Sequence, residues 1–330
     1  MRPRPARLPL SLVAALLVAA SPVLLAGCAH PTTDQARSTG AVRPAPGAAS
    51  GAASGGALPA ETAPTKPFAV GVRQVRFARG DRPLPTTIWY PATGPAGGSA
   101  RGGAAPAPGR FPLVVFSHGL GGLPESYAPL TTRWAAAGFV VAAPAYPKTN
   151  AHVAHPQVLD IASQPADASA VIDGVLALDA NAGDPLAGHV DPQRVGAAGH
   201  SAGGYTTVGM FTSGRDPRLR AGIVIAGGLL GGAYQGAPAP LLFVHGDKDA
   251  TVSYAVGRSA YDNLPWPKAF LTLIGAGHLG YLGPGDRPFD AAVRTTVDFL
   301  RWSLYGDPAA KSRLPGDATV SGVCRLDLTL

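Results

Sequence analysis

Short apolar runs alternate with helical stretches from about residue 67 to residue 305, and this alternation limits the fold more than any other feature of the chain. Apolar strands are expected at 112–116, 139–143, 194–198, 221–226, 240–245 and 269–274, after two opening strands at 69–77 and 86–90. Helices are expected at 126–137, 166–178, 254–263 and 289–305, with one more directly after Ser201. Wholly apolar strands that alternate with helices form a parallel sheet covered on both faces. The sequence therefore predicts an α/β fold with a mostly parallel central sheet, in which ligands bind beyond the carboxyl ends of the strands.

The first 27 residues have the pattern of a secretory signal, because three arginines precede a long apolar run. The run ends in Leu25-Ala26-Gly27-Cys28, which resembles the lipobox of bacterial lipoproteins. The resemblance implies that Cys28 receives a diacylglyceryl group and becomes the new N-terminus after cleavage. An uncleaved membrane anchor is the alternative, since about 20 apolar residues can span a bilayer. Either interpretation places the rest of the protein outside the cytoplasmic membrane, attached to it or released from it.

Glycine and proline are abundant, with 43 and 34 residues of 330, a level close to that of low-complexity chains. Much of this excess lies in residues 28–66, which carry no period of 2 or 3.6 and are expected to form a disordered tether. A second such patch, 94–109, is expected to be a long surface loop. The sequence thus predicts a signal peptide at 1–27, the lipidated tether at 28–66, one catalytic domain at 67–305 and a C-terminal extension at 306–330.

The charge and the cysteine count exclude several classes of protein. The formal net charge is +7, and it falls to +4 once the three arginines of residues 1–27 are removed. This excess is too small to indicate a nucleic-acid partner. The two cysteines, Cys28 and Cys324, exclude a disulfide-rich scaffold and a cysteine-based zinc site. Membrane contact is therefore expected through the lipid on Cys28.

A G-x-S-x-G motif, Gly199-His200-Ser201-Ala202-Gly203, follows the expected strand at 194–198 and precedes a helix. In this context the motif is a nucleophile elbow, in which the serine occupies a strained turn. Gly199 and Gly203 would let the strand and the helix approach each other closely. An ordinary tight turn between strand and helix is the alternative. The motif predicts that Ser201 is a nucleophile.

A serine hydroxyl needs a base to take its proton and an acid to orient that base. Asp247 and Asp249 follow the strand at 240–245, and His278 follows the strand at 269–274. The chain order Ser, Asp, His is that of α/β-hydrolases, and the sequence resembles this superfamily over nearly all of 67–305. The family pattern H-G-x-x-D-x-x-V begins at His245 and implies that Asp249 is the acid and His278 the base. Asp247 competes for the acid role, but its side chain is better suited to cap the turn.

The oxyanion formed during ester hydrolysis needs two preorganised N–H donors. The resemblance implies that these are the backbone N–H groups of Ala202 and Leu120, with Gly119 permitting the second turn. His118 and His200 flank the two motifs. They are expected to pack or to form hydrogen bonds nearby rather than to act as the base.

Within the superfamily, three segments resemble platelet-activating factor acetylhydrolase and dienelactone hydrolase-like esterases. They are the run 112–122, Ile88-Trp89-Tyr90-Pro91 and Gln164-Pro165-Ala166-Asp167. Bacterial cutinase-like polyesterases are more distant. Dienelactone hydrolases proper use a cysteine nucleophile, whereas this chain has Ser201. Polyesterases commonly have an aromatic residue where this chain has Leu120 and Met where it has Ala202. They also often have a C-terminal disulfide, whereas Cys324 lacks a partner once Cys28 is lipidated. Polyester hydrolysis is therefore not the favoured activity.

The resemblance implies a serine hydrolase that cleaves carboxylic esters without metal or cofactor, and a monomer is expected. Residues 227–239 are too short for a helical lid, so an open cleft is expected, with 146–165 forming one wall. Small-molecule, lipid or polymeric esters are the expected substrates. A catalytically idle envelope lipoprotein is the alternative from another class, and a thioesterase or a peptidase would use the same triad.

Overall fold

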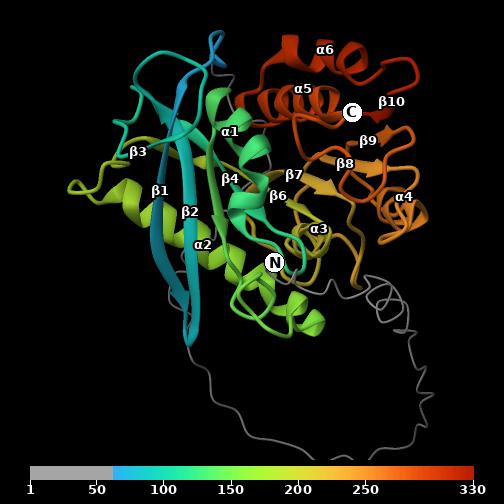
Figure 1. The fold of residues 1–330 in the computed structure, drawn as a ribbon, viewed down its shortest axis with the longest axis horizontal. Coiled ribbons are helices and arrows are strands. Elements are labelled where there is room, and N and C mark those ends of the chain that lie inside the picture. Colours follow the sequence, from blue (N-terminus) through green and yellow to red (C-terminus); the bar gives the residue numbers. More distant parts are fainter. Residues whose placement is uncertain (1–61) are drawn as a thin grey trace, which may run out of the picture.

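The computed structural model describes residues 62–330 and is drawn in Figure 1. The predictions for residues 1–27, for Cys28 and for most of 28–66 lie outside the described residues. At the end of the predicted tether, Ala63 is buried and the carbonyl of Pro64 accepts a hydrogen bond from Arg301 at 2.8 Å. This last part of the segment therefore packs on the domain.

A ten-stranded sheet runs through the molecule in the order β10-β9-β8-β7-β6-β4-β5-β2-β1-β3. The strands are β1 (Ala69–Arg79), β2 (Arg82–Ala92), β3 (Arg101–Gly102), β4 (Phe111–Ser117), β5 (Val140–Pro144), β6 (Val190–His200), β7 (Leu219–Ile225), β8 (Leu241–Gly246), β9 (Lys268–Leu273) and β10 (Cys324–Thr329). The central strands from β5 to β9 pair in parallel, whereas β1, β2 and β10 join antiparallel neighbours. The predicted α/β fold with a mostly parallel sheet is confirmed.

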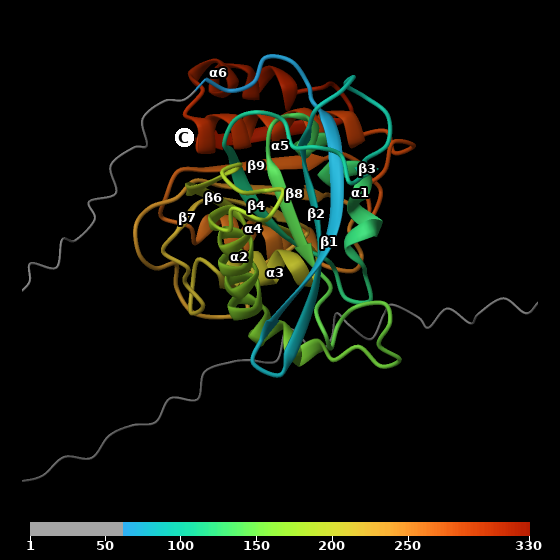
Figure 2. The same ribbon diagram turned by 90° about the vertical axis from the view of Figure 1, so that its left-hand side faces the viewer.

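Helices cover both faces of the sheet, as the fully buried strands require. They are α1 (Ala128–Ala136), α2 (Gln164–Ala180), α3 (Ala202–Gly209), α4 (Tyr254–Asp262), α5 (Phe289–Leu300) and α6 (Pro308–Asp317). Figure 2 shows α5 and α6 on one side of the sheet and α2, α3 and α4 on the other. Helix α1 contacts α5 through Trp134, whose side chain is fully buried and donates a hydrogen bond to Thr296 at 3.0 Å. No helix within residues 62–330 is both long and apolar enough to cross a membrane.

Three segments differ in detail from the expectation. The C-terminal extension is part of the fold, because α6 packs on α5 and β10 adds an edge strand beside β9. The expected helix at 289–305 changes at Arg301–Tyr305 into a π-helical turn and ends at Gly306, whose φ is 74°. The loop at 94–109 contains the short strand β3, which pairs with β1. Each difference depends on contacts with distant segments, which local sequence patterns do not record.

Parallel pairing places the carboxyl ends of β4, β6, β8 and β9 at the same edge of the sheet. The residues that follow these four strands carry the predicted oxyanion turn, the elbow and the two candidate partners of the serine. Between β7 and β8, residues 226–240 contain no helix, so this connection carries no helical lid.

Candidate active site

Ser201 stands in a strained turn between β6 and α3, with φ 56° and ψ −120°. Side chains other than glycine rarely adopt positive φ, and such strain is concentrated at functional sites. A Cβ atom at Gly199 would overlap the carbonyl of Gly203, and one at Gly203 would overlap the carbonyl of Ser117. Glycine at both positions therefore permits the close approach of β6, α3 and β4 that presents Ser201 at the sheet edge.

Asp249 and His278 form a close pair. His278 Nδ1 donates to Asp249 Oδ2 at 2.7 Å, while Asp249 Oδ1 accepts the backbone N–H groups of Thr251 and Val252 at 2.8 and 2.9 Å. Burial by itself would raise the pKa of Asp249, but hydrogen bonds from His245 and His278 outweigh it and hold this pKa well below its usual range. The carboxylate is thus ionised at neutral pH. The side chain of Asp247 instead accepts the N–H of Gly275 at 2.7 Å.

His245 is a third member of this group that the sequence reasoning used only as part of a motif. Its side chain is buried, and Nε2 lies 2.9 Å from the carbonyl of Val252 and 3.4 Å from Asp249 Oδ2. Because a carbonyl only accepts, Nε2 carries the proton and points at both oxygens. His245 thereby holds the loop between β8 and α4 and the carboxylate that it presents.

Tyr127 connects the oxyanion turn to the loop of His278, and no sequence motif indicated this residue. Its hydroxyl accepts the N–H of Gly119 and contacts His200 Nδ1, both at 2.9 Å, and His200 Nε2 lies 3.0 Å from the carbonyl of His278. Because the carbonyl of His278 can only accept, Nε2 of His200 carries the proton. Nδ1 of the neutral ring therefore accepts a hydrogen bond from the Tyr127 hydroxyl. The rings of His200 and His278 lie 4.7 Å apart between centroids, which places His278 beside the elbow.

Neither His118 nor His200 has a ring nitrogen free to act as a base. His118 Nδ1 contacts the carbonyl of Gly119 at 2.8 Å, and its Nε2 accepts the N–H of Tyr146 at 3.0 Å. Burial lowers the pKa of His118 to about 4. Burial, together with the neighbouring His278, lowers the pKa of His200 to about 3. Both rings are therefore neutral at neutral pH.

The turn after β4 leaves one amide available. The N–H of Gly119 donates to Tyr127, that of Gly121 to the carbonyl of Thr149 at 2.7 Å, and that of Gly122 to the carbonyl of Gly119 at 2.9 Å. Among residues 62–330 the N–H of Leu120 has no partner. The N–H of Ala202 lies in the first turn of α3, where backbone donors have no intrahelical partner.

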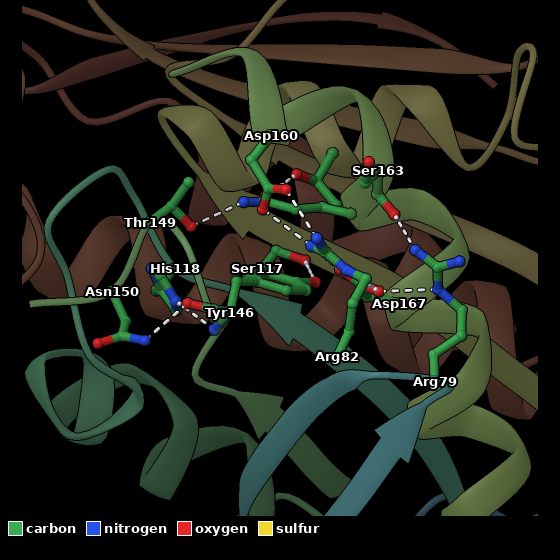
Figure 3. Close-up of polar contacts among 12 residues, drawn as sticks. Arg79, Arg82, Ser117, His118, Tyr146, Thr149, Asn150, Asp160, Ser163 and Asp167 are labelled. Atoms are coloured by element: carbon green, nitrogen blue, oxygen red, sulfur yellow. Dashed lines mark hydrogen bonds and ion pairs between the residues drawn. The ribbon is translucent and has the colours of Figure 1, made fainter. Parts of the chain in front are cut away.

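A buried ion network holds the segment that forms one wall of the site. Figure 3 shows Arg79 and Arg82, from the hairpin of β1 and β2, pointing at Asp160 and Asp167. Arg82 contacts Asp160 at 2.7 Å and Asp167 at 2.6 Å, and the exposed fractions of the three side chains are 12%, 5% and 0%. Asp160 belongs to the short helix η3 (Val158–Ser163) and Asp167 to α2. The network therefore fixes η3 relative to the sheet.

A pocket of about 460 Å³ opens beside Ser201. Its lining includes Ser201 and Ala202 from the elbow, Leu120 from the oxyanion turn and Ile161 from η3. The far wall is formed by Val252 and α4. The expectation that the segment 146–165 lines the site is thus met by Ile161. No group of three or more His, Cys, Asp or Glu side chains within residues 62–330 is arranged to hold a metal ion.

The mostly parallel sheet and the serine elbow at its carboxyl edge define an α/β-hydrolase. A sequence model of the PET hydrolase-like family matches residues 44–285, which is more than half of the chain. The chain belongs to this family of ester-hydrolysing α/β-hydrolases. The match falls in the polyesterase branch, which the sequence motifs had placed as the more distant relationship. A search of curated proteins gave no match.

Proposed function

We propose that the protein is a serine hydrolase that cleaves carboxylic esters through an acyl-enzyme intermediate. Ser201 Oγ attacks the ester carbonyl and passes its proton to His278, which Asp249 orients through Nδ1. The N–H groups of Ala202 and Leu120 hold the oxyanion of the tetrahedral intermediate. His278 then protonates the leaving alcohol, and water hydrolyses the acyl-enzyme by the same steps. The mechanism needs no metal or cofactor.

The observation that carries this proposal is the Asp249–His278 pair, in which Nδ1 of His278 lies 2.7 Å from Oδ2 of Asp249. The ring of His278 also lies beside the ring of His200, the residue that precedes Ser201. Membership of the PET hydrolase-like family supports ester hydrolysis. A thioesterase or a peptidase would use the same residues, and an idle envelope lipoprotein would keep the fold without the reaction. The amide of Leu120 has no partner within residues 62–330 and is therefore available to an oxyanion, as the proposed mechanism requires.

Ser201→Ala tests the proposal, with Ser213→Ala, an exposed serine, as the matched control. Ser201→Ala should lose hydrolysis of p-nitrophenyl butyrate and labelling by a fluorophosphonate, whereas Ser213→Ala should retain both. A Ser201→Ala protein that still turns over the ester would overturn the assignment. Folded wild-type protein that takes no fluorophosphonate label would favour the idle lipoprotein. A thioester and a peptide substrate in the same assay distinguish the other two activities.

We also propose that Cys28 carries a lipid that attaches the enzyme to the outer side of the cytoplasmic membrane, where it meets its ester substrates as a monomer. The support is the Leu25-Ala26-Gly27-Cys28 sequence. Mass spectrometry of the N-terminal peptide from membrane-extracted protein should show a diacylglyceryl group on Cys28. Cys28→Ala should abolish that mass, and an unmodified Cys28 in the wild type contradicts the proposal.

A further inference from the structure

The pocket beside Ser201 extends along one face of α4. Ser253, Val256 and Ala260 line it, and their spacing of three and four residues places them on one side of the helix. The seven steps of the chain from Ser253 to Ala260 cover about 10 Å at the rise of an α-helix. Ser259, the neighbour of Ala260 on α4, also lines the pocket and is exposed. The lining of the pocket therefore runs from Ser201 and Ala202 along this face of α4 to Ser259 and Ala260, and we call it the channel.

The two halves of an ester must lie on different sides of Ser201. The leaving oxygen has to reach His278, because this histidine returns the proton to it. Ser201, Ala202 and Leu120 all line the pocket, whereas His278 does not. The leaving alcohol consequently lies outside the pocket, and the acyl chain enters it.

The walls of the pocket match a hydrocarbon chain. Leu120, Ile161, Val252 and Val256 contribute aliphatic side chains, and no charged side chain in the described part of the protein lines it. Tyr205 is the one aromatic residue in the lining. An aromatic acyl group would gain from several aromatic partners. A flexible aliphatic chain gains from apolar contact alone, which these aliphatic side chains offer.

The alcohol side is open by comparison. Leu279 follows His278 directly in the chain, and 61% of its surface is exposed. The Leu279 side chain therefore encloses a leaving group only weakly, and we infer that contacts on this side discriminate little between alcohols.

We propose that this channel is an acyl-chain site, and that it selects straight-chain aliphatic acyl groups up to about eight carbons while the alcohol is unselected. The inference rests on the proposed function, since it assigns the two halves of the substrate from the role of His278. Each methylene buried in the channel raises kcat/KM by about twofold to fourfold. Carbons beyond the exposed end at Ser259 remain in water and add nothing.

The first test uses two substrate series. In p-nitrophenyl esters from acetate to palmitate, kcat/KM should rise by at least about 50-fold up to octanoate and then level off. The second series consists of the hexanoate esters of methanol, butanol and p-cresol, with hydrolysis measured by the release of acid. Here kcat/KM should vary by no more than about tenfold, a spread that leaving-group chemistry alone can produce. p-Nitrophenyl benzoate should be hydrolysed more slowly than the hexanoate. An acyl profile that is flat, or a benzoate faster than the hexanoate, would overturn the proposal.

The second test narrows the channel from α4. Val256→Phe should lower the ratio of octanoate to acetate kcat/KM by at least about tenfold, because the ring occupies the space of several methylenes. Ala255→Phe is the matched control, since Ala255 is the exposed neighbour on the same helix and does not line the pocket. This control should keep the wild-type ratio. Equal ratios in both variants would contradict the assignment of the channel.

A third measurement needs no variant. p-Nitrophenyl alkylphosphonates place their alkyl group where the acyl chain lies once Ser201 is phosphonylated. Hexylphosphonate should inactivate the wild type at least about tenfold faster than methylphosphonate. Equal rates would reject the acyl-chain site but leave the serine hydrolase intact. Absence of any inactivation and of any ester hydrolysis would instead reject the proposed function itself.

Discussion

The hydroxyl of Tyr127 lies 2.9 Å from Nδ1 of His200, and this contact continues from the amide of Gly119 to the carbonyl of His278. Burial raises the pKa of Tyr127 to about 12, so the hydroxyl keeps its proton. The Gly119 N–H donates to the Tyr127 hydroxyl, this hydroxyl donates to Nδ1 of His200, and Nε2 of His200 donates to the carbonyl of His278. The oxyanion turn and the loop of the candidate base are thereby positioned relative to each other.

Tyr127→Phe should lower kcat by up to about 100-fold while KM changes little, because the turn and the histidine lose their mutual alignment. The free energy of unfolding should fall by about 1–3 kcal/mol, since the Gly119 N–H and His200 Nδ1 lose their partner. Steady-state kinetics on a p-nitrophenyl ester and urea unfolding measure the two effects.

Tyr281→Phe is the control for this prediction. The Tyr281 hydroxyl is also buried and has no hydrogen-bond partner among residues 62–330. Removing it should leave stability unchanged or raise it, because an unsatisfied buried hydroxyl is removed. If both variants lose the same activity, the connection through Tyr127 has no special role.

Asp249→Asn should reduce kcat by about 10⁴-fold, because the amide no longer orients the imidazole or stabilises its charged form. Asp247→Asn should cost less than about tenfold, since the amide oxygen of Asn can still accept the N–H of Gly275. Kinetics of both variants on one ester make the comparison. A larger loss in Asp247→Asn would exchange the two roles.

Arg82→Met should lower the free energy of unfolding by about 3–5 kcal/mol, because it leaves two buried carboxylates without their shared partner. Arg110→Met removes a half-exposed arginine from Asp179 and should cost less than about 1 kcal/mol. Urea unfolding at neutral pH measures both. If the two variants lose similar amounts of unfolding free energy, burial of the Arg82 network does not increase its contribution to stability.

Acid should destabilise the protein through His200. The folded state holds the pKa of His200 near 3, mainly by burial, whereas the unfolded chain has the ordinary value near 6.5. Between these values the unfolded state binds a proton that the folded state does not, so stability falls as the pH falls, by about 1.4 kcal/mol per unit. His200→Gln should remove this contribution. The difference in unfolding free energy between wild type and variant should therefore change between pH 6 and pH 4 and stay constant above pH 8. A constant difference at all pH values would contradict the pKa assigned to His200.

The sequence by itself determined the order of the elements and the positions of the reactive residues along them. Apolar strands and glycine spacing are local features, so the sheet, the elbow at Ser201 and the placement of Asp249 and His278 after their strands followed from short stretches of sequence. These are properties of a few neighbouring residues, and they are imposed by backbone sterics and by burial.

Only the tertiary structure decided which distant residues meet. The H-G-x-x-D-x-x-V pattern favoured Asp249 over Asp247 as the acid, but only the packed loops bring Asp249 to His278 and direct Asp247 to Gly275. Tyr127 and Arg82 lie 73 and 85 positions from His200 and Asp167, their respective partners, and no spacing rule connects them. The edge strand β10 likewise depends on β9 for its hydrogen bonds. Such contacts arise from the simultaneous burial and pairing of side chains across the whole fold, and a linear pattern does not contain that information.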